Sequence, residues 1–269
     1  MAGYGIIPTG AGRETMHEAA LDPDGRVIDR QETHMDGHFA QGRGTIVFDL
    51  DGTLVDSVPD LAGSLDTLMA EKGLAPIGIE QTRRLIGHGI PNLVRRGLAE
   101  RGVAWEEAAG AADVKRFTEI YGARVSLETR PYPDVEEVLA VLQAQGWRMG
   151  VCTNKMERFA RAVVDDLGLA RYFAVVAGPD TFKVGKPDPR HLTETARVAG
   201  GGEPVIYVGD SDVDIATGRA AGVPVIAMTY GYTKTPLHGL GADRLIDAFA
   251  ELPDAIATIV AAAGELGVR

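Results

Sequence analysis

Five short apolar runs, separated by stretches with helical periodicity, are the feature that most restricts the fold of this chain. The apolar runs cover residues 45–50, 147–153, 173–177, 205–209 and 225–228. Patterns that fit helices occur at 135–145, 157–167, 190–199, 213–221 and 248–262. Such alternation is typical of a parallel sheet with helices on both faces. The sequence therefore predicts an α/β fold with a doubly wound parallel sheet.

One interval breaks this alternation, because the sequence from Pro59 to Arg130 is helical without any strand pattern. Segments at 61–72, 79–86, 92–101 and 105–123 predict a small helical bundle inserted after the first strand. We expect a core made of residues 44–59 and 130–269 and an inserted helical domain of residues 60–129.

Residues 1–43 show no sustained period of 2 or 3.6, so we predict a poorly ordered N-terminal extension. A short hairpin around residues 25–28 is the alternative, and translation starting at Met35 is a further hypothesis. Within the core, Asp134 and Asp188 are predicted helix N-caps. Glycines are predicted to end four helices, at positions 146, 168, 200 and 222.

Two carboxylates follow the first apolar run, in the segment Asp49-Leu50-Asp51-Gly52-Thr53-Leu54-Val55-Asp56-Ser57. Residues i and i+2 of an extended segment share a side, so Asp49 and Asp51 can face one ligand at the end of the strand. One carboxylate could then attack a substrate while the other moves protons. Gly52 allows the backbone to turn and approach a ligand closely. An ordinary Asp-Gly turn closing the strand is the alternative.

Three more polar segments follow apolar runs of their own. They are Thr153-Asn154-Lys155, Lys186-Pro187-Asp188-Pro189 and Gly209-Asp210-Ser211-Asp212-Val213-Asp214. The carboxyl ends of the strands in an open parallel sheet line one edge, and ligands bind at that edge. The sequence therefore predicts that four polar segments converge on one crevice.

With these segments identified, the chain resembles the haloacid dehalogenase (HAD) superfamily from about Gly44 to Leu252, and within it the phosphoglycolate phosphatase family. The resemblance rests on residues 49–57, 130–133, 152–155, 186–189 and 208–211, and also on Gly87-His88-Gly89 and Gly231-Tyr232-Thr233. It implies a Rossmann-like core whose inserted helices form a cap that closes over the active site.

The resemblance also implies roles for the acidic residues. Asp49 would be the nucleophile that forms an aspartyl-phosphate. Asp51 would protonate the leaving oxygen and later deprotonate the attacking water. Asp210 would bind Mg²⁺ together with the Asp49 side chain and the Asp51 backbone carbonyl. Few protein ligands and several waters suit Mg²⁺, which loses its water reluctantly.

Substrate binding is expected from three further positions of the motifs. Thr153 and Asn154 match the phosphate-binding position of the superfamily, and Gly52 would let backbone N–H groups approach the phosphate. Lys186 matches the family lysine because it directly precedes a proline, and Lys183 is the fallback. Thr153 and Lys186 are also predicted catalytic groups. A polar strand end with a helix cap is the alternative for Thr153 and Asn154.

Several residues are assigned supporting roles. Asp214 is expected to order Lys186 or a metal-bound water, whereas Asp212 is expected to be an exposed residue in the first turn of a helix. His88 could reach the organic end of the substrate, with a helix cap or an exposed turn as its alternative. Four arginines of the inserted helices could recognise a substrate carboxylate or lie on a solvated face, namely Arg83, Arg84, Arg95 and Arg96.

The leading functional hypothesis is a Mg²⁺-dependent phosphatase that converts 2-phosphoglycolate to glycolate. Its rivals are hydrolysis of another small phosphate ester or of pyrophosphate, and mutation of a phosphosugar. Haloacid dehalogenation is disfavoured because Asp51 supplies an acid/base group that halide departure does not require. A binding module without activity is also disfavoured, because the clustered charges are costly without a ligand.

Composition restricts partners and location. The formal net charge of −11 argues against nucleic acid as a partner. No apolar stretch approaches the roughly 18 to 20 residues that span a bilayer, and no secretory signal pattern is evident, so we expect a cytoplasmic protein without a membrane partner. The one cysteine, Cys152, excludes an internal disulfide and leaves oxygen atoms as the expected metal ligands. A monomer or a homodimer is expected.

Overall fold

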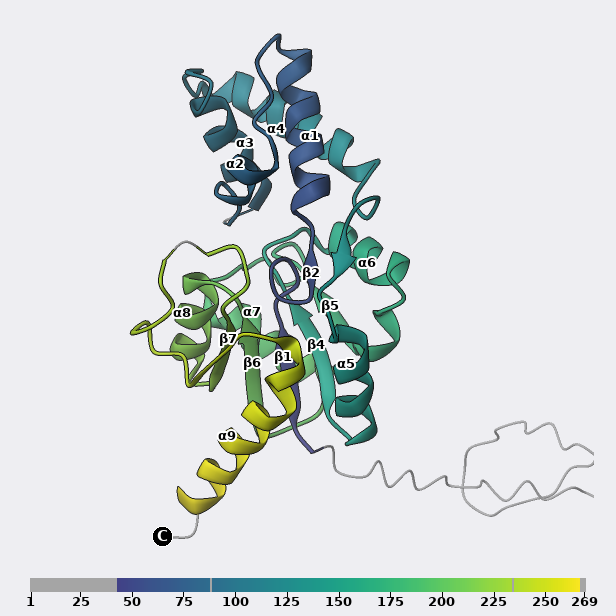
Figure 1. Ribbon diagram of the computed structural model, residues 1–269, viewed down its shortest axis with the longest axis vertical. Helices are drawn as coiled ribbons and strands as arrows, with labels where there is room; N and C mark the ends of the chain where they lie inside the picture. Colours follow the sequence, from purple (N-terminus) through teal and green to yellow (C-terminus); the bar gives the residue numbers. More distant parts are fainter. Residues whose placement is uncertain (1–42, 88, 234, 267–269) are drawn as a thin grey trace, which may run out of the picture. The chain divides into compact units, whose positions relative to one another are not determined.

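The computed structural model of this chain describes residues 43–87, 89–233 and 235–266 (Figure 1). The predicted N-terminal extension lies outside the described residues except for Arg43. His88 lies outside them as well.

A parallel sheet of six strands forms the core of the described residues. Its strand order is β5-β4-β1-β6-β7-β8, and every neighbouring pair is parallel. The strands are β1 (Thr45–Phe48), β4 (Arg148–Cys152), β5 (Val175–Ala177), β6 (Val205–Gly209), β7 (Val225–Met228) and β8 (Arg244–Ile246). The five apolar runs thus form strands, and the predicted α/β fold class is confirmed. The sequence pattern did not reveal β8.

Helices cover both faces of the sheet. Successive residues of a strand point to opposite faces, so neighbouring residues of β1 pack against different helices. Ile46 and Phe48 lie in the main hydrophobic cluster with residues of α5 and α9, whereas Val47 packs with Leu192 of α7. The core helices are α5 (Val135–Ala144), α6 (Glu157–Asp166), α7 (Pro189–Ala199), α8 (Asp212–Ala221) and α9 (Leu252–Leu266). Two short 3-10 helices, Ala170–Tyr172 and Phe249–Glu251, complete the core.

The predicted helix ends are confirmed in part. The Asp188 side chain accepts the N–H of Arg190 and caps α7, as expected. Gly200 and Gly222 are left-handed C-caps, with φ of 76° and 68°. Asp134 occupies the N-cap position of α5, as predicted, but it is in a left-handed conformation, with φ of 65°, and its side chain makes no capping hydrogen bond.

Four helices lie between β2 (Val55–Asp56) and β3 (Arg130–Pro131), and we call them the helical insertion. They are α1 (Val58–Glu71), α2 (Ile79–Arg83), α3 (Gly89–Ala99) and α4 (Glu107–Gly122). Strands β2 and β3 are antiparallel partners, with Val55 opposite Pro131 and Asp56 opposite Arg130. The chain therefore enters and leaves the helical insertion at neighbouring points.

A buried carboxylate joins the two ends of the helical insertion. Asp60, in the first turn of α1, is fully buried. Its Oδ2 accepts hydrogen bonds from the N–H of Glu128 (2.9 Å), the N–H of Thr129 (2.8 Å) and the Thr129 hydroxyl (2.7 Å). Buried N–H groups are costly without a partner, so Asp60 fixes the segment that leads into β3.

We expect Asp60→Ala to lower the free energy of unfolding by about 3 kcal/mol, because it removes the acceptor of the Glu128 N–H and of two donors of the buried Thr129, its N–H and its hydroxyl. Urea unfolding followed by circular dichroism would measure the change. Glu71→Ala, which removes an exposed ion pair with Arg116, is the matched control and should cost at most about 1 kcal/mol. Equal losses in both variants would contradict this role of Asp60.

Candidate active site

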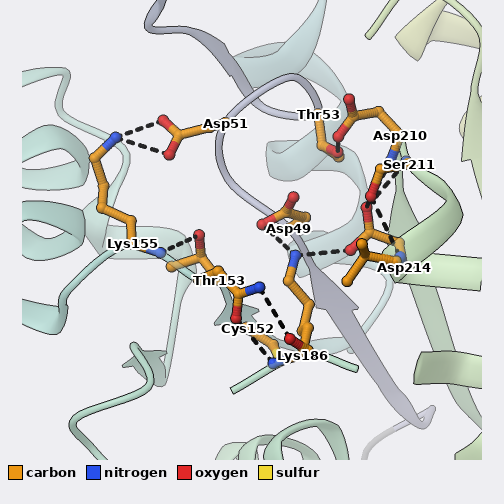
Figure 2. A network of polar contacts seen from close by, with 12 residues as sticks. Asp49, Asp51, Thr53, Cys152, Thr153, Lys155, Lys186, Asp210, Ser211 and Asp214 are labelled. Carbon is orange, nitrogen blue, oxygen red and sulfur yellow. Dashed lines mark hydrogen bonds and ion pairs between the residues drawn. The ribbon is translucent and has the colours of Figure 1, made fainter. Parts of the chain in front are cut away.

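The four predicted polar segments meet at the carboxyl ends of the central strands. Asp49 follows β1, Thr153 follows β4, Lys186 precedes α7, and Asp210 follows β6 (Figure 2). All four are at least nine-tenths buried. One carboxylate oxygen from each of Asp49, Asp210 and Asp214 lies within 4.8 Å of the other two. The structure thus brings together the residues that the sequence placed at one crevice.

Lys186 supplies the positive charge inside this acidic group. Its Nζ lies 2.8 Å from Oδ1 of Asp49 and 2.7 Å from Oδ1 of Asp214, and its side chain is only 3% exposed. Asn154 holds the backbone of Lys186 in place: its Oδ1 accepts the Lys186 N–H at 2.8 Å and its Nδ2 donates to the Lys186 carbonyl at 3.1 Å. Lys183 is exposed and donates to the carbonyl of Asp180 instead.

Asp214 lies at the centre of a hydrogen-bond network that anchors this part of the site. Its Oδ1 accepts from Lys186 and from the Tyr207 hydroxyl, at 2.7 Å each, and its Oδ2 accepts the N–H groups of Asp210 and Ser211. Ser211 and Asp214 form a reciprocal capping box at the start of α8. Burial raises the pKa of Asp214, but the Lys186 ammonium and the hydrogen bonds outweigh burial, so that this pKa lies below its ordinary value.

Two glycines make room for Asp210. A Cβ on Gly52 would lie 2.4 Å from Oδ2 of Asp210, and a Cβ on Gly231 would lie 2.2 Å from the same oxygen. Any other residue at these positions would displace the carboxylate. The N–H of Tyr232 donates to Oδ2 at 2.8 Å and the Thr53 hydroxyl donates to Oδ1 at 3.1 Å, so the carboxylate has a fixed orientation.

Three carboxylates, those of Asp49, Asp210 and Asp214, surround the single ammonium of Lys186 among the described side chains, so negative charge is in excess. Burial raises the pKa of Asp49 to about 7, although Lys186 opposes the shift, and burial raises the pKa of Asp210 well above its ordinary value. Oδ1 of Asp49 is buried, and Lys186 Nζ, at 2.8 Å, is the partner that the described residues give it. Hard oxygen ligands with excess negative charge are what Mg²⁺ prefers. The side chains of Asp49 and Asp210 therefore fit a divalent cation. Each oxygen of Asp214, in contrast, already accepts at least two hydrogen bonds, whereas each oxygen of Asp210 accepts one.

Asp51 turns toward a different partner. Lys155 Nζ lies 2.6 Å from Oδ1 and 2.8 Å from Oδ2 of Asp51, and the Ser57 hydroxyl donates to Oδ1 at 2.6 Å. Figure 2 shows the Asp51 carboxylate directed to Lys155 and away from Asp210. The Thr153 hydroxyl accepts the N–H of Lys155 at 3.2 Å.

Four residues without a predicted role contact functional candidates in the structure, namely Lys155, Ser57, Tyr207 and Tyr232. The motif Thr153-Asn154-Lys155 contained the one available signal, because a lysine follows the predicted phosphate-binding residues directly. As predicted, Asp212 is exposed in the first turn of α8.

One cavity of about 780 Å³ is lined by Asp49, Asp51 and Asp210, by Lys155 and by residues of the helical insertion. Arg84 and Arg96 contribute to this lining. Arg83 instead pairs with Asp56 at 3.2 Å, and Arg95 donates to Asn92. The cavity therefore joins the polar centre of the core to the helices predicted to select the substrate.

Two further features of the structure are the burial of Cys152 and the composition of the helices. Burial raises the pKa of the Cys152 thiol to about 12, so this cysteine is a buried apolar residue and no thiolate nucleophile. Among residues 43–87, 89–233 and 235–266, no helix combines the length and the apolar composition that crossing a bilayer requires.

Comparisons with known proteins agree with this geometry. The family model of haloacid dehalogenase-like hydrolases matches residues 44–222. A phosphoglycolate phosphatase of Caulobacter vibrioides is 39% identical over 217 residues, which cover 80% of this chain and 92% of that protein. One of Agrobacterium fabrum is 43% identical over 211 residues, covering 78% and 91%.

Solved structures of phosphatases are also similar to this chain. The crystal structure of a predicted phosphoglycolate phosphatase from Haemophilus somnus has a TM-score of 0.73 and 30% identity, and the match covers 78% of this chain and 96% of that one. CbbY from Rhodobacter sphaeroides, in complex with phosphate, has a TM-score of 0.66 and 25% identity over 77% of this chain and 95% of that one.

The chain thus belongs to the haloacid dehalogenase-like hydrolases, and it is a phosphoric monoester hydrolase. The fold, the buried acidic group and the curated relatives all point to this class. Within it, the chain belongs to the phosphoglycolate phosphatase family.

Proposed function

We propose that this protein is a Mg²⁺-dependent phosphatase that hydrolyses 2-phosphoglycolate to glycolate through an aspartyl-phosphate. The observation that carries the proposal is the buried group of Asp49, Asp210 and Lys186 at the end of the central strand. The phosphoglycolate phosphatases that are 39% to 43% identical to this chain support the choice of substrate.

The first half-reaction transfers the phosphoryl group to the enzyme. An Asp49 oxygen attacks phosphorus, and the bond from phosphorus to the ester oxygen breaks as Asp51 gives that oxygen a proton. Lys186 offsets the charge of the transferring oxygens, and the hydroxyl of Thr153 binds them. The N–H of Gly52, a predicted substrate-binding position, donates instead to the Val55 carbonyl at 2.9 Å. Mg²⁺, held by Asp49, Asp210 and the Asp51 carbonyl, would reduce the repulsion between the carboxylate and the phosphate.

The second half-reaction restores the enzyme. Asp51, now ionised, takes a proton from water, and the water oxygen attacks phosphorus. The bond between phosphorus and the Asp49 oxygen breaks, which releases inorganic phosphate and the Asp49 carboxylate. Asp51 ends protonated, as it began, so one residue serves both steps. Asp214 acts here as a positioning residue, because it orients Lys186.

A panel of kcat/KM values with Mg²⁺ tests the substrate. We expect kcat/KM to be higher for 2-phosphoglycolate than for pyrophosphate, glucose 6-phosphate or glycerol 3-phosphate, because relatives of about 40% identity are named phosphoglycolate phosphatase. A higher value for another ester or for pyrophosphate would overturn the assignment and keep the chemistry. Conversion of β-glucose 1-phosphate to glucose 6-phosphate without phosphate release would favour a mutase. If no compound of the panel releases phosphate, the result would favour a binding module without activity.

The expected cytoplasmic location and the monomeric or homodimeric state remain predictions. Sedimentation of the purified chain and fractionation of cells would measure them.

A further inference from the structure

Lys155 is a buried cation that faces the active-site cavity and that the proposed chemistry does not use. Its side chain is 4% exposed, and it lines the same cavity as Asp49 and Lys186. Its Nζ lies 5.2 Å from the centre of the Tyr121 ring of α4. A buried ammonium is costly without partners, and here an aromatic face and one carboxylate are its partners.

The geometry around Lys155 is that of a carboxylate-binding site. The ammonium contacts both oxygens of Asp51, at 2.6 and 2.8 Å. Charge-assisted hydrogen bonds of this length are the strong ones. The Tyr121 ring stabilises the cation from the side of the helical insertion. The site therefore presents one fixed positive charge to whatever carboxylate lies beside it.

Other cations of the cavity wall are less suited to this task. The guanidinium of Arg96 donates to the carbonyls of Arg84 and Leu85, so its donors serve the end of α2. Arg84 is exposed to solvent, and exposed ion pairs contribute little. Lys186 contacts two carboxylates, Asp49 and Asp214, and faces the transferring phosphate in the proposed mechanism. Among the described carboxylates, Lys155 contacts that of Asp51 alone. Lys155 is thus the best placed of these groups to read a second anion on the substrate.

Distances set how far that anion can be from the reacting phosphate. If Asp51 protonates the leaving oxygen, that oxygen lies within a hydrogen bond of Asp51, and Lys155 lies one further hydrogen bond away. The leaving oxygen and the ammonium are then separated by about two hydrogen-bond lengths, or roughly 5 to 6 Å at most. A carboxylate on the carbon next to the ester oxygen falls within this span, whereas a distal charge on a long substrate lies beyond it.

We propose that Lys155 is the specificity residue of this site, and that it selects phosphate esters with a carboxylate on the carbon that bears the ester oxygen. The inference rests on the proposed function and names the substrate class of the same site. The substrate carboxylate replaces Oδ2 of Asp51 as a partner of the ammonium, and Oδ1 of Asp51 keeps its contact with Lys155. Oδ1 also keeps its hydrogen bond with Ser57, so Oδ2 becomes free to contact the leaving oxygen.

Two esters that differ only in the second anion provide the test. They are 2-phosphoglycolate and 2-hydroxyethyl phosphate, in which a neutral CH₂OH group replaces the carboxylate. The readout is the ratio of their kcat/KM values in wild type, Lys155→Met and Lys155→Arg, with Mg²⁺ in excess. A charged hydrogen bond in a buried site contributes enough that we expect Lys155→Met to lower the ratio by about 10- to 100-fold. Lys155→Arg should restore part of the preference, because it keeps the charge.

Lys183→Met is the matched control, because Lys183 is exposed and bonds only to the Asp180 carbonyl among the described residues. It should leave the ratio within about twofold of wild type. Circular dichroism and thermal unfolding of each variant establish that it is folded, and Lys155→Arg carries the comparison if Lys155→Met is not.

A structural role for Lys155 gives a different result. If Lys155→Met lowers kcat/KM for both esters by the same factor, the ammonium only positions Asp51, and the inference is overturned while the proposed function stands. If wild type hydrolyses neither ester, the proposed function itself fails. If wild type shows no preference for the acidic ester, Lys155 is not a reader of the second anion.

Discussion

Asp49→Asn is expected to lower kcat for 2-phosphoglycolate by about 10⁴-fold or more, because an amide cannot attack phosphorus as the carboxylate does. The structure supports an intact fold in the variant, since asparagine has the same shape and Lys186 keeps Asp214 as a partner. Release of inorganic phosphate measures the rate. Mass spectrometry of acid-quenched enzyme should show one added phosphoryl group on wild type and none on the variant.

The same substitution should change stability in a pH-dependent way. Burial raises the pKa of Asp49 to about 7 in the folded chain, against 3.8 in the unfolded chain. Above pH 3.8 the unfolded chain ionises this group more readily than the folded chain, so the folded state loses stability as pH rises toward 7. Without metal, we therefore expect Asp49→Asn to be more stable than wild type at pH 8 and equal to it near pH 3.

Asp212→Asn is the matched control for Asp49→Asn. Asp212 is exposed at the start of α8, in the same motif as Asp210, and should tolerate the change within about twofold in kcat. Residual activity of Asp49→Asn within tenfold of wild type, or an added phosphoryl group on that variant, would refute the nucleophile assignment.

Asp210→Asn is expected to lower kcat/KM by about 10³-fold and to weaken Mg²⁺ binding, because it removes a charged oxygen ligand. Binding can be followed without turnover. At 100 times its dissociation constant, Mg²⁺ should stabilise wild type by about 2.7 kcal/mol, which raises Tm by roughly 5 to 10 °C in a chain of this size. The variant should respond by about 1 °C or less.

Chelation offers the complementary measurement. EDTA should abolish phosphate release by wild type, and Mg²⁺ should restore it. An equal rise of Tm with Mg²⁺ in wild type and in Asp210→Asn would place the cation elsewhere and would contradict the assignment.

Local patterns explain why much of the fold was predictable from sequence. The apolar runs that became β1, β4, β5, β6 and β7 are bounded by glycines, prolines and charges, and their ends were predicted to within two residues. Strand β8 was missed because Arg244–Ile246 is short and carries a charge. The Asp134 position was predicted, but the sequence pattern did not reveal that its left-handed backbone, with φ of 65°, leaves the side chain without a capping hydrogen bond.

The site residues also divide into those that the sequence pattern predicted and those that it did not. Asp49 and Asp210 directly follow strands, and Lys186 lies in the loop between β5 and α7, so sheet topology predicted that they meet. Lys155 reaches Asp51 across 104 positions of sequence, and its second partner, Tyr121, comes from the helical insertion. Such contacts depend on side-chain packing between distant segments, which no spacing rule contains.

The pairing of β2 with β3 has a consequence for how this kind of enzyme can diversify. Because Val55 and Pro131 stand opposite each other, everything between them is a module whose two ends already touch. A tight turn or a different set of helices could occupy that gap without shifting the catalytic strand β1. Chemistry and choice of substrate can then change independently, the first in the sheet loops and the second in an exchangeable segment.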